Sequence, residues 1–208
     1  MLLKTISWKI ENDIGHLVLN QPPANIMTRH FFDELNALTR IVIPGSNIKA
    51  LIIYGNGRHF SSGADHCDLT NRIREKLPAD YPKELPDFLK ETTQSFLFFE
   101  KLSIPSIAAI RGTCFGSALE LALFCKYRIC AEGTVIGFPE TSFGLMPGCG
   151  GSIKLPSIVG RSKAIELIIS GRNFSATEAY DWGIVHKIVH RKVLIEETMR
   201  MATSMIER

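Results

Sequence analysis

The sequence predicts an α/β protein in which short strands and longer helices alternate along the chain. Apolar runs bounded by glycine or proline, such as Ala50 to Tyr54 and Ile104 to Ile110, have the length and composition of buried strands. Between them lie segments whose apolar residues recur at helical spacing. Repeated crossovers from strand to helix and back are typical of layered α/β folds. The 208 residues are enough for one domain with a full core.

The first quarter of the chain predicts a hairpin and a helix. Alternating polarity over residues 2–11 and 14–20 predicts an edge strand and its return strand. Thr28 is expected to cap a helix that runs to about Ile41. The predicted inner face of this helix consists of Phe32, Leu35 and Leu38.

The region between residues 71 and 101 predicts a surface loop followed by a helix. Residues 71–86 are charged and carry three prolines, which predicts a mobile loop that we interpret as a lid. The segment from Phe88 to Lys101 has helical spacing and an aromatic face. The aromatic residues are Phe96, Phe98 and Phe99. This face is predicted to be exposed, so we expect the chain to self-associate.

The stretch from Ile104 to Glu140 is the centre of the predicted organisation. Its apolar strand ends at a turn of small residues, 112–117, and a buried helix follows with Glu120 in its first turn. A further strand at 127–131 precedes Glu140. The free N–H groups and the positive dipole end of such a helix point back at the turn. The turn is therefore suited to hold a developing negative charge.

The C-terminal part of the chain predicts a glycine-rich turn at 145–151, then helices and one strand. Ser175 followed by Glu178 has the spacing of a capping box at the start of one helix. The remaining predicted elements are helices up to Val159, over 161–170 and over 192–208, and a strand over 184–189.

Composition excludes several classes of protein. The net charge of +3 is too small and too scattered to predict a nucleic-acid partner. The five cysteines include no CxxC pair, which predicts reduced thiols and no metal site. The N-terminus does not resemble a signal peptide, and no apolar run approaches the roughly 18 residues of a membrane span. We therefore expect a cytoplasmic protein that does not bind membranes.

Three motifs, taken in order, resemble the crotonase (enoyl-CoA hydratase/isomerase) superfamily. They are FSSGADHCDL at 60–69, IRGTCFGSALELALFCKYRICAEG at 110–133 and FPETSFGLMPGCGG at 138–151. The match is co-linear from about Ser7 to Ile206. The resemblance implies an α/β, crotonase-like spiral of ββα units that binds acyl-CoA thioesters. In that family two backbone N–H groups bind the thioester oxygen, so that an enolate can form beside the carbonyl.

Carried over position by position, the resemblance places the two oxyanion donors on the N–H groups of Ala64 and Ser117. Ser117 stands where the family more often has glycine. Glu120 and Glu140 fall on the two glutamates of the family's hydratases and are the expected catalytic residues. The expected substrate-binding residues are Ala24, Ser62, Gly63, Asp65, His66, Gly116 and Pro139.

Adding water to a 2-enoyl thioester requires a base for the water and an acid for the α-carbon, and two carboxyls can share these tasks. The resemblance therefore favours an enoyl-CoA hydratase. Three alternatives stay open: an isomerase that uses mainly Glu140, a decarboxylase that uses His66, and an inactive relative that acts as an interaction subunit. Taken singly, a first-turn glutamate more often serves the helix dipole. Both coenzyme A and an acyl-carrier protein are open as the acyl carrier.

The resemblance also implies a domain division and an assembly. Residues 1–190 are expected to form the crotonase-like core domain. Residues 191–208 are expected to begin the family's C-terminal helical segment, which this chain shortens or lacks. The expected assembly is a homotrimer or hexamer. The only cofactor expected is the coenzyme A that belongs to the substrate.

Overall fold

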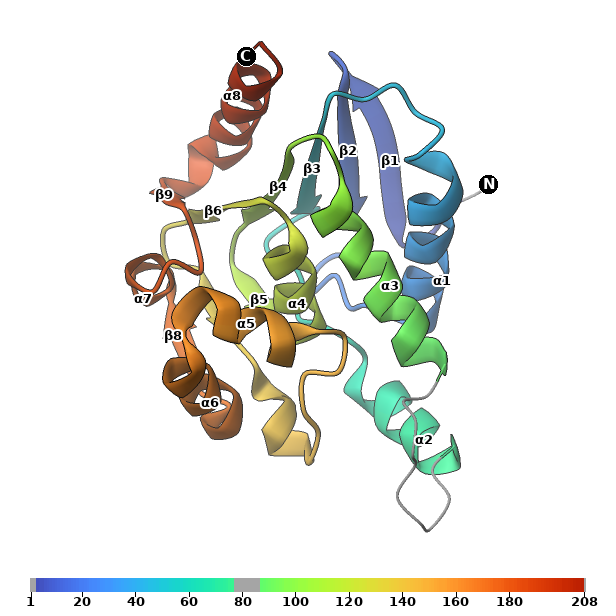
Figure 1. Ribbon diagram of the computed structural model, residues 1–208, viewed down its shortest axis with the longest axis vertical. Coiled ribbons are helices and arrows are strands. Elements are labelled where there is room, and N and C mark those ends of the chain that lie inside the picture. The colour runs from blue at the N-terminus through green and yellow to red at the C-terminus, as the bar shows by residue number, and fades with distance from the viewer. Residues whose placement is uncertain (1–2, 77–86, 208) are drawn as a thin grey trace.

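The fold is organised around a six-stranded sheet (Figure 1). The computed structural model describes residues 3–76 and 87–207. The strands of this sheet are β1 Ile6–Glu11, β2 Ile14–Leu19, β3 Ala50–Gly55, β4 Ser106–Ile110, β6 Tyr127–Ala131 and β9 Lys187–Val189. They lie in the order β1-β2-β3-β4-β6-β9, with β1 and β2 antiparallel and the other neighbours parallel. The predicted N-terminal hairpin with its edge strand is thereby confirmed.

A smaller sheet stands beside the large one and joins distant parts of the chain. Its strands are β5 Thr113–Phe115, β7 Val135–Gly137 and β8 Asn173–Ser175, in the order β5-β7-β8. The sequence analysis did not predict any of these strands. Each has three residues, which is too short to show an alternating pattern.

Helices cover the large sheet on both faces. The α-helices are α1 Arg29–Ala37, α2 His66–Lys76, α3 Asp87–Lys101, α4 Ser117–Phe124, α5 Gly151–Val159, α6 Arg161–Ser170, α7 Ala176–Asp181 and α8 Leu194–Ile206. Short turns of other helix types are η1 Leu38–Val42, η2 Pro139–Phe143 and η3 Arg191–Val193. On one face, residues such as Leu51 and Ile53 pack with α1, α3 and α4. On the other, Ile52 and Ile107 pack with α8.

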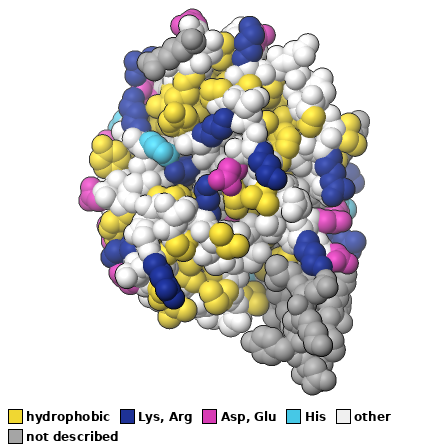
Figure 2. Space-filling view, in the orientation of Figure 1, with side chains coloured by type: hydrophobic (Ala, Val, Ile, Leu, Met, Phe, Trp, Pro, Cys, Tyr) yellow, Lys and Arg dark blue, Asp and Glu magenta, His cyan; other side chains and the backbone are white. Residues whose placement is uncertain are grey.

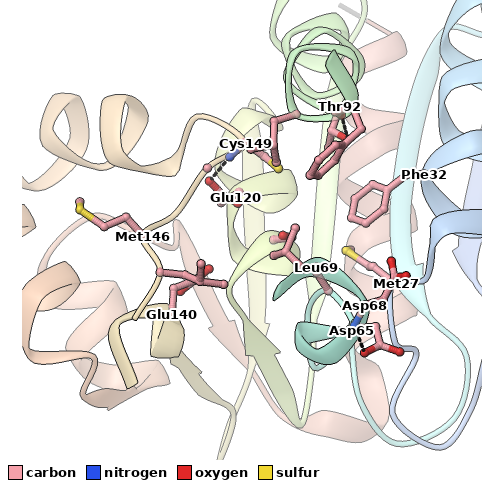
Figure 3. Close-up of a pocket in the computed structure, with 16 residues that line it drawn as sticks. Met27, Phe32, Asp65, Asp68, Leu69, Thr92, Glu120, Glu140, Met146 and Cys149 are labelled. Atoms are coloured by element: carbon pink, nitrogen blue, oxygen red, sulfur yellow. Dashed lines mark hydrogen bonds between the residues drawn. The ribbon is translucent and has the colours of Figure 1, made fainter. Parts of the chain in front are cut away.

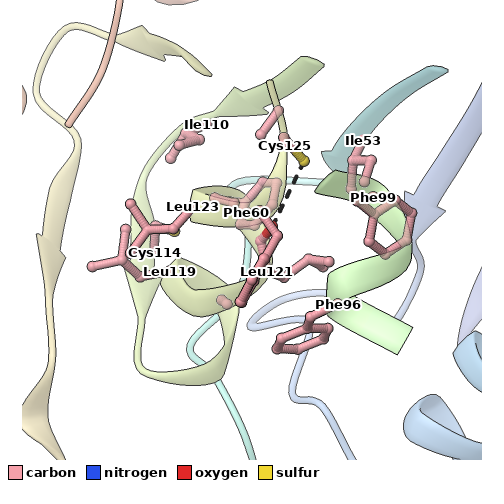
Figure 4. Close-up of a cluster of buried hydrophobic side chains, with 14 of the residues drawn as sticks. Ile53, Phe60, Phe96, Phe99, Ile110, Cys114, Leu119, Leu121, Leu123 and Cys125 are labelled. Carbon is pink, nitrogen blue, oxygen red and sulfur yellow. Dashed lines mark hydrogen bonds between the residues drawn. The ribbon is translucent and has the colours of Figure 1, made fainter. Parts of the chain in front are cut away.

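The helix α4 is completely buried. All of its residues are buried, so it has no polar face. Figure 4 shows Leu119, Leu121 and Leu123 of α4 among aromatic side chains from other elements, including Phe60 and Phe96. Because α4 is enclosed on every side, its N-terminus is held in a fixed place. This fixed terminus is where the functional site lies.

The predicted exposed aromatic face of α3 is wrong. Phe96 and Phe99 are both 0% exposed and belong to the core, while Phe98 is partly buried against it. Phe96 and Phe99 stand three positions apart and so share one face of the helix, which packs against the core rather than facing solvent. The expectation of self-association therefore loses this basis.

Other predictions about the helices α1 and α2 are also corrected. The segment predicted as a loop from residue 71 is helical as far as Lys76, where α2 ends, and the rest of that loop lies outside the described residues. Thr28 occupies the N-cap position of α1, but its side chain makes no capping hydrogen bond. The helix predicted to reach Ile41 changes at Leu38 into a π-helical turn. The inner face is formed by Phe31 as well as Leu35 and Leu38, while Phe32 is only partly buried.

The capping box at the start of α7 is confirmed. The Glu178 N–H donates to Ser175 Oγ at 3.2 Å, and the Ser175 N–H donates to Glu178 Oε2 at 2.8 Å. The strand predicted over 184–189 is shorter, since only β9 is extended.

On the face seen in Figure 2, basic side chains are scattered among apolar and acidic ones and do not gather in one patch.

Candidate active site

A loop before α2 runs along β5 and brings Ala64 to the N-terminus of α4. The Ser61 N–H donates to the Thr113 carbonyl at 3.1 Å, and the Phe115 N–H donates to the Ser61 carbonyl at 3.2 Å. Gly63 has a φ of 89°, and a Cβ atom there would lie 2.5 Å from the Phe115 carbonyl oxygen. Only glycine allows this close approach, which sets Ala64 beside the turn before α4.

The N–H groups of Ala64 and Ser117 are free within the described chain. In the parallel bridge between Met27 and Ala64, the Met27 N–H donates to the Gly63 carbonyl at 2.9 Å and the Asp65 N–H donates to the Met27 carbonyl at 3.2 Å. Neither hydrogen bond uses the Ala64 N–H. Ser117 is the first residue of α4, where N–H groups have no partner inside the helix. Two free donors beside a positive helix end are suited to an oxyanion.

The carboxyl of Glu120 is buried and held by backbone donors. Its side chain is 1% exposed. Oε1 accepts the N–H of Cys149 at 2.9 Å (Figure 3) and the N–H of Gly151 at 2.8 Å. Burial raises the pKa of Glu120 to about 7, although these donors favour the ionised form. A Cβ atom on Gly151 would lie 2.9 Å from Oε1, so the absence of a side chain at Gly151 lets its N–H approach the carboxyl.

The carboxyl of Glu140 has a different environment. Glu140 stands in the first turn of η2, and its buried Oε2 atom has no hydrogen-bond partner among the described residues. Burial, followed by the nearby Glu120, raises the pKa of Glu140 to about 8. A Cβ atom on Gly116 would lie 2.6 Å from Glu140 Oε1, so the carboxyl lies against the turn that begins α4.

Two adjoining cavities meet at these groups. The inner cavity, of about 50 Å³, is lined by Glu120 and by apolar side chains of α1, α2 and α3. The outer cavity, of about 300 Å³, is lined by Gly63, Gly116 and η2. The residues that line both are Ala64, Leu69, Ser117, Glu140 and Leu145. The free N–H groups and one carboxyl therefore stand where the two cavities join.

The structure gathers all but one of the predicted site residues around these cavities. Those on the outer cavity are Ser62, Gly63, His66, Gly116 and Pro139. Asp65 lies on the inner cavity, and its Oδ1 atom accepts the N–H groups of Cys67 and Asp68, both at 3.1 Å. Ala24 lines neither cavity, but its carbonyl accepts the Ser62 N–H at 2.9 Å and so supports the loop.

Several residues of the site were not predicted. The N–H groups of Cys149 and Gly151 hold Glu120, and the glycine-rich turn at 145–151 was the available signal. Asn25, 2% exposed, donates to the carbonyls of Asn56 and His59, both at 2.9 Å, and so supports the loop that leads to Ala64. The unpredicted walls of the inner cavity include Met27, Phe32, Leu89 and Thr92, and Phe143 lines the outer one.

Within residues 3–76 and 87–207, no group of three or more His, Cys, Asp or Glu residues is arranged to hold a metal ion. In the same ranges, none of the helices is both long and apolar enough to cross a membrane.

The fold and this constellation define an enzyme class. Comparison with solved structures places the chain in the crotonase fold: an enoyl-CoA hydratase subunit of Geobacillus kaustophilus aligns with a TM-score of 0.85 at 29% identity. That alignment covers 99% of this chain and 77% of the other. Residues 9–208 match the family of enoyl-CoA hydratases/isomerases. The chain belongs to the enoyl-CoA hydratase/isomerase family.

Curated relatives agree with this assignment. The chain is 36% identical to a probable enoyl-CoA hydratase of Bacillus subtilis, over 88% of this chain and 68% of that protein. It is 37% identical to an enoyl-CoA isomerase/hydratase of Mycosarcoma maydis, over 93% of this chain and 71% of the other. Some other relatives are longer, and the chain spans 65% of one and 27% of another.

Proposed function

We propose that this chain catalyses the addition of water to a 2-enoyl thioester of coenzyme A. One observation carries the proposal: Glu120 and Glu140 both line the inner cavity, together with the free N–H groups of Ala64 and Ser117. A thioester carbonyl at these N–H groups would extend its acyl chain toward the carboxyls. The name of the Bacillus relative supports the same reaction.

In the proposed reaction, the carboxyls divide two proton transfers. Two N–H groups donate to Glu120 and favour its ionised form, whereas Oε2 of Glu140 has no partner among the described residues, so Glu120 is the better candidate for the ionised partner. Glu120 takes a proton from water while the water oxygen bonds to the β-carbon. The carbonyl oxygen becomes an enolate held by Ala64 and Ser117, and Glu140 then donates its proton to the α-carbon. A proton exchange between the carboxyls and solvent resets the site.

An isomerase is the second candidate. The free oxygen of Glu140 favours it, because one carboxyl that takes and returns a proton is enough to move a double bond. The Mycosarcoma relative, whose name gives both activities, supports keeping both. Decarboxylation through His66 has less support, since His66 lines the outer cavity and not the inner one.

The test is incubation with a panel of acyl-CoA and acyl-carrier-protein thioesters, followed by mass spectrometry. Hydration adds one water to a 2-enoyl substrate, isomerisation leaves the mass unchanged, and decarboxylation removes carbon dioxide. The hydratase proposal expects the first result with coenzyme A thioesters. Turnover of none of them would support an interaction subunit. Preference for the carrier-protein thioesters would reassign the carrier.

We also propose a trimer or a pair of trimers. With Phe96 and Phe99 in the core, the support now comes from apolar side chains exposed on α5 and α6. These are Ile153 at 80%, Ile165 at 51% and Ile169 at 61% exposure. Light scattering at micromolar concentration should give the mass of three or six chains, and a monomer would contradict this proposal.

A further inference from the structure

Two aromatic side chains meet beside the outer cavity. The rings of His66 and Phe143 are stacked, with centroids 4.6 Å apart and an angle of 21° between their planes. Both line the outer cavity, together with Ala64, Ser117 and Glu140. Phe143 is 47% exposed, and its ring lies against the His66 ring. The pair joins α2 to η2, which are far apart in the sequence.

The His66 side of the contact is close in the chain to one oxyanion donor. His66 begins α2 only two residues after Ala64. Asp65, between them, accepts the N–H groups of Cys67 and Asp68 and donates its own N–H to the Met27 carbonyl. These hydrogen bonds hold the backbone that lies between the Ala64 N–H and the His66 ring.

The Phe143 side is connected to Glu140 in the same way. Phe143 is the last residue of η2, and Glu140 is in its first turn. The Leu145 N–H donates to the Glu140 carbonyl at 3.0 Å, and Gly144 turns the chain with a φ of 71°. Phe143 and Glu140 are therefore held within one short, hydrogen-bonded turn.

Glu140 needs such support more than Glu120 does. The Glu120 carboxyl is fixed by two N–H groups, whereas Oε2 of Glu140 has no partner among the described residues. The direction of the Glu140 carboxyl therefore depends on where η2 is held. An aromatic contact to the neighbouring wall of the cavity is suited to that task.

We propose that His66 and Phe143 are positioning residues whose stacked rings hold the Glu140 turn at a fixed distance from the Ala64 N–H. The expected kinetic effect rests on the proposed function, whereas the stacking of the two rings is independent of it. It assigns His66 a role different from chemistry on the substrate. Reacting groups displaced by about an ångström lose rate while the substrate still binds, because the binding surface is larger than the reacting centre.

The kinetic test separates kcat from KM for a 2-enoyl-CoA substrate that the wild type hydrates. Phe143→Leu keeps apolar volume but removes the ring, and we expect kcat to fall about tenfold with KM changed by less than about threefold. Phe143→Tyr and His66→Phe each keep a ring at the substituted position and should retain most of the wild-type kcat. His66→Leu with Phe143→Leu should be no worse than either alone. Tyr180→Leu, at an exposed aromatic on α7, is the matched control and should have no effect.

An unchanged kcat in Phe143→Leu, or a loss that Phe143→Tyr does not restore, would overturn the inference. Amide hydrogen exchange tests the contact without any turnover. Phe143→Leu should speed exchange in residues 62–70, which are distant in sequence, while Tyr180→Leu should not. Unchanged exchange there would also overturn the inference. If the wild type hydrates no thioester but exchange responds as expected, the proposed function fails and the contact stands.

Discussion

Glu34 on α1 and Glu140 on η2 are two carboxyls in contrasting surroundings: hydrogen-bond donors surround Glu34, whereas Glu140 lies near a second carboxyl, Glu120. Glu34 is 8% exposed, and its oxygens accept the N–H groups of Lys4, Thr5 and Ile6 and the Thr5 hydroxyl. Burial alone would raise the pKa of Glu34, but these hydrogen bonds outweigh it and lower the pKa. Oε2 of Glu140 has no such partner among the residues that the structure describes, and burial, followed by the nearby Glu120, raises the pKa of Glu140.

The difference indicates that Glu34 is a structural carboxylate, whereas the Glu140 carboxyl is available to interact with a substrate. Glu34 is fully occupied and fastens the N-terminal strand to α1, so it has no capacity left for a substrate. Glu140 leaves a buried oxygen unsatisfied, which is unfavourable for the folded state. A substrate or water can supply the missing partner. Unpaired buried groups of raised pKa are typical of functional sites.

The largest effect is expected for the site carboxyls. Glu120→Gln and Glu140→Gln keep the shape but remove proton transfer, so each should lower kcat for hydration by about a hundredfold or more. The double variant should lose less than the product of the two, because the carboxyls act as a unit. Steady-state kinetics with a 2-enoyl-CoA substrate measures this.

The control for these variants is Glu196→Gln on the exposed face of α8, which should keep full activity. An isomerase would respond differently, with activity lost in Glu140→Gln and only mildly reduced in Glu120→Gln. Hydration within a factor of about two of wild type in both single variants would show that neither carboxyl transfers protons.

The next effect concerns the oxyanion donors. Ala64→Pro removes one N–H, and a missing donor of this kind costs about a hundredfold in kcat because it acts on charge that develops in the transition state. Ala64→Gly keeps the N–H and should stay within a few-fold of wild type. Substrate binding, measured by calorimetry in the Glu140→Gln background, should change much less than kcat. An equal loss in both proline and glycine variants would assign the effect to the loop backbone instead.

At Glu34 the expected change is in stability and not in catalysis. Glu34→Gln places an amide group among N–H donors and should lower the free energy of unfolding by about 2 kcal/mol. Because the pKa of Glu34 is lowered, its contribution is present above the ordinary value near 4.5 and is lost as the pH falls through the folded-state pKa. Urea unfolding at pH 7 and pH 4 tests both statements. A variant as stable as wild type at pH 7 would contradict them.

The smallest expected effect is on the pH dependence of stability at Glu140. A raised pKa means that the folded protein keeps a proton that the unfolded chain releases above about 4.5. Stability should therefore decline as the pH rises toward about 8, and Glu140→Gln should remove part of that decline. Unfolding curves at pH 5.5 and 8.5 provide the comparison. An identical decline in wild type and variant would mean that Glu140 is not protonated in the folded state.

The sequence predicted the elements whose own residues carry the pattern. The hairpin, the capping box at Ser175 and the cluster of Ala64, Ser117, Glu120 and Glu140 all followed from local spacing or from the family resemblance. For the backbone donors to Glu120, the sequence indicated the glycine-rich turn at 145–151 but not the side chain that this turn holds. The donors to Glu120 lie 29 and 31 residues away, and an N–H group has no side chain to identify it.

The error at Phe96 and Phe99 had a related cause. A helical aromatic face is equally compatible with the core and with an interface, and only the position of α3 against the core shows which one it meets. The stacking of His66 on Phe143 could not be predicted either, because the two residues are far apart in the chain.

The most direct test of the account is the pH dependence of kcat/KM for hydration. With Glu120 ionised and Glu140 protonated, activity should fall below about pH 7, where the base gains a proton, and above about pH 8, where the acid loses one. The two pH values at which activity falls are properties of the Glu120 and Glu140 pair together, because the two carboxyls influence each other's protonation. A narrow bell with both limbs is the predicted result. A profile that is flat from pH 6 to 9 would contradict the division of proton transfer between Glu120 and Glu140.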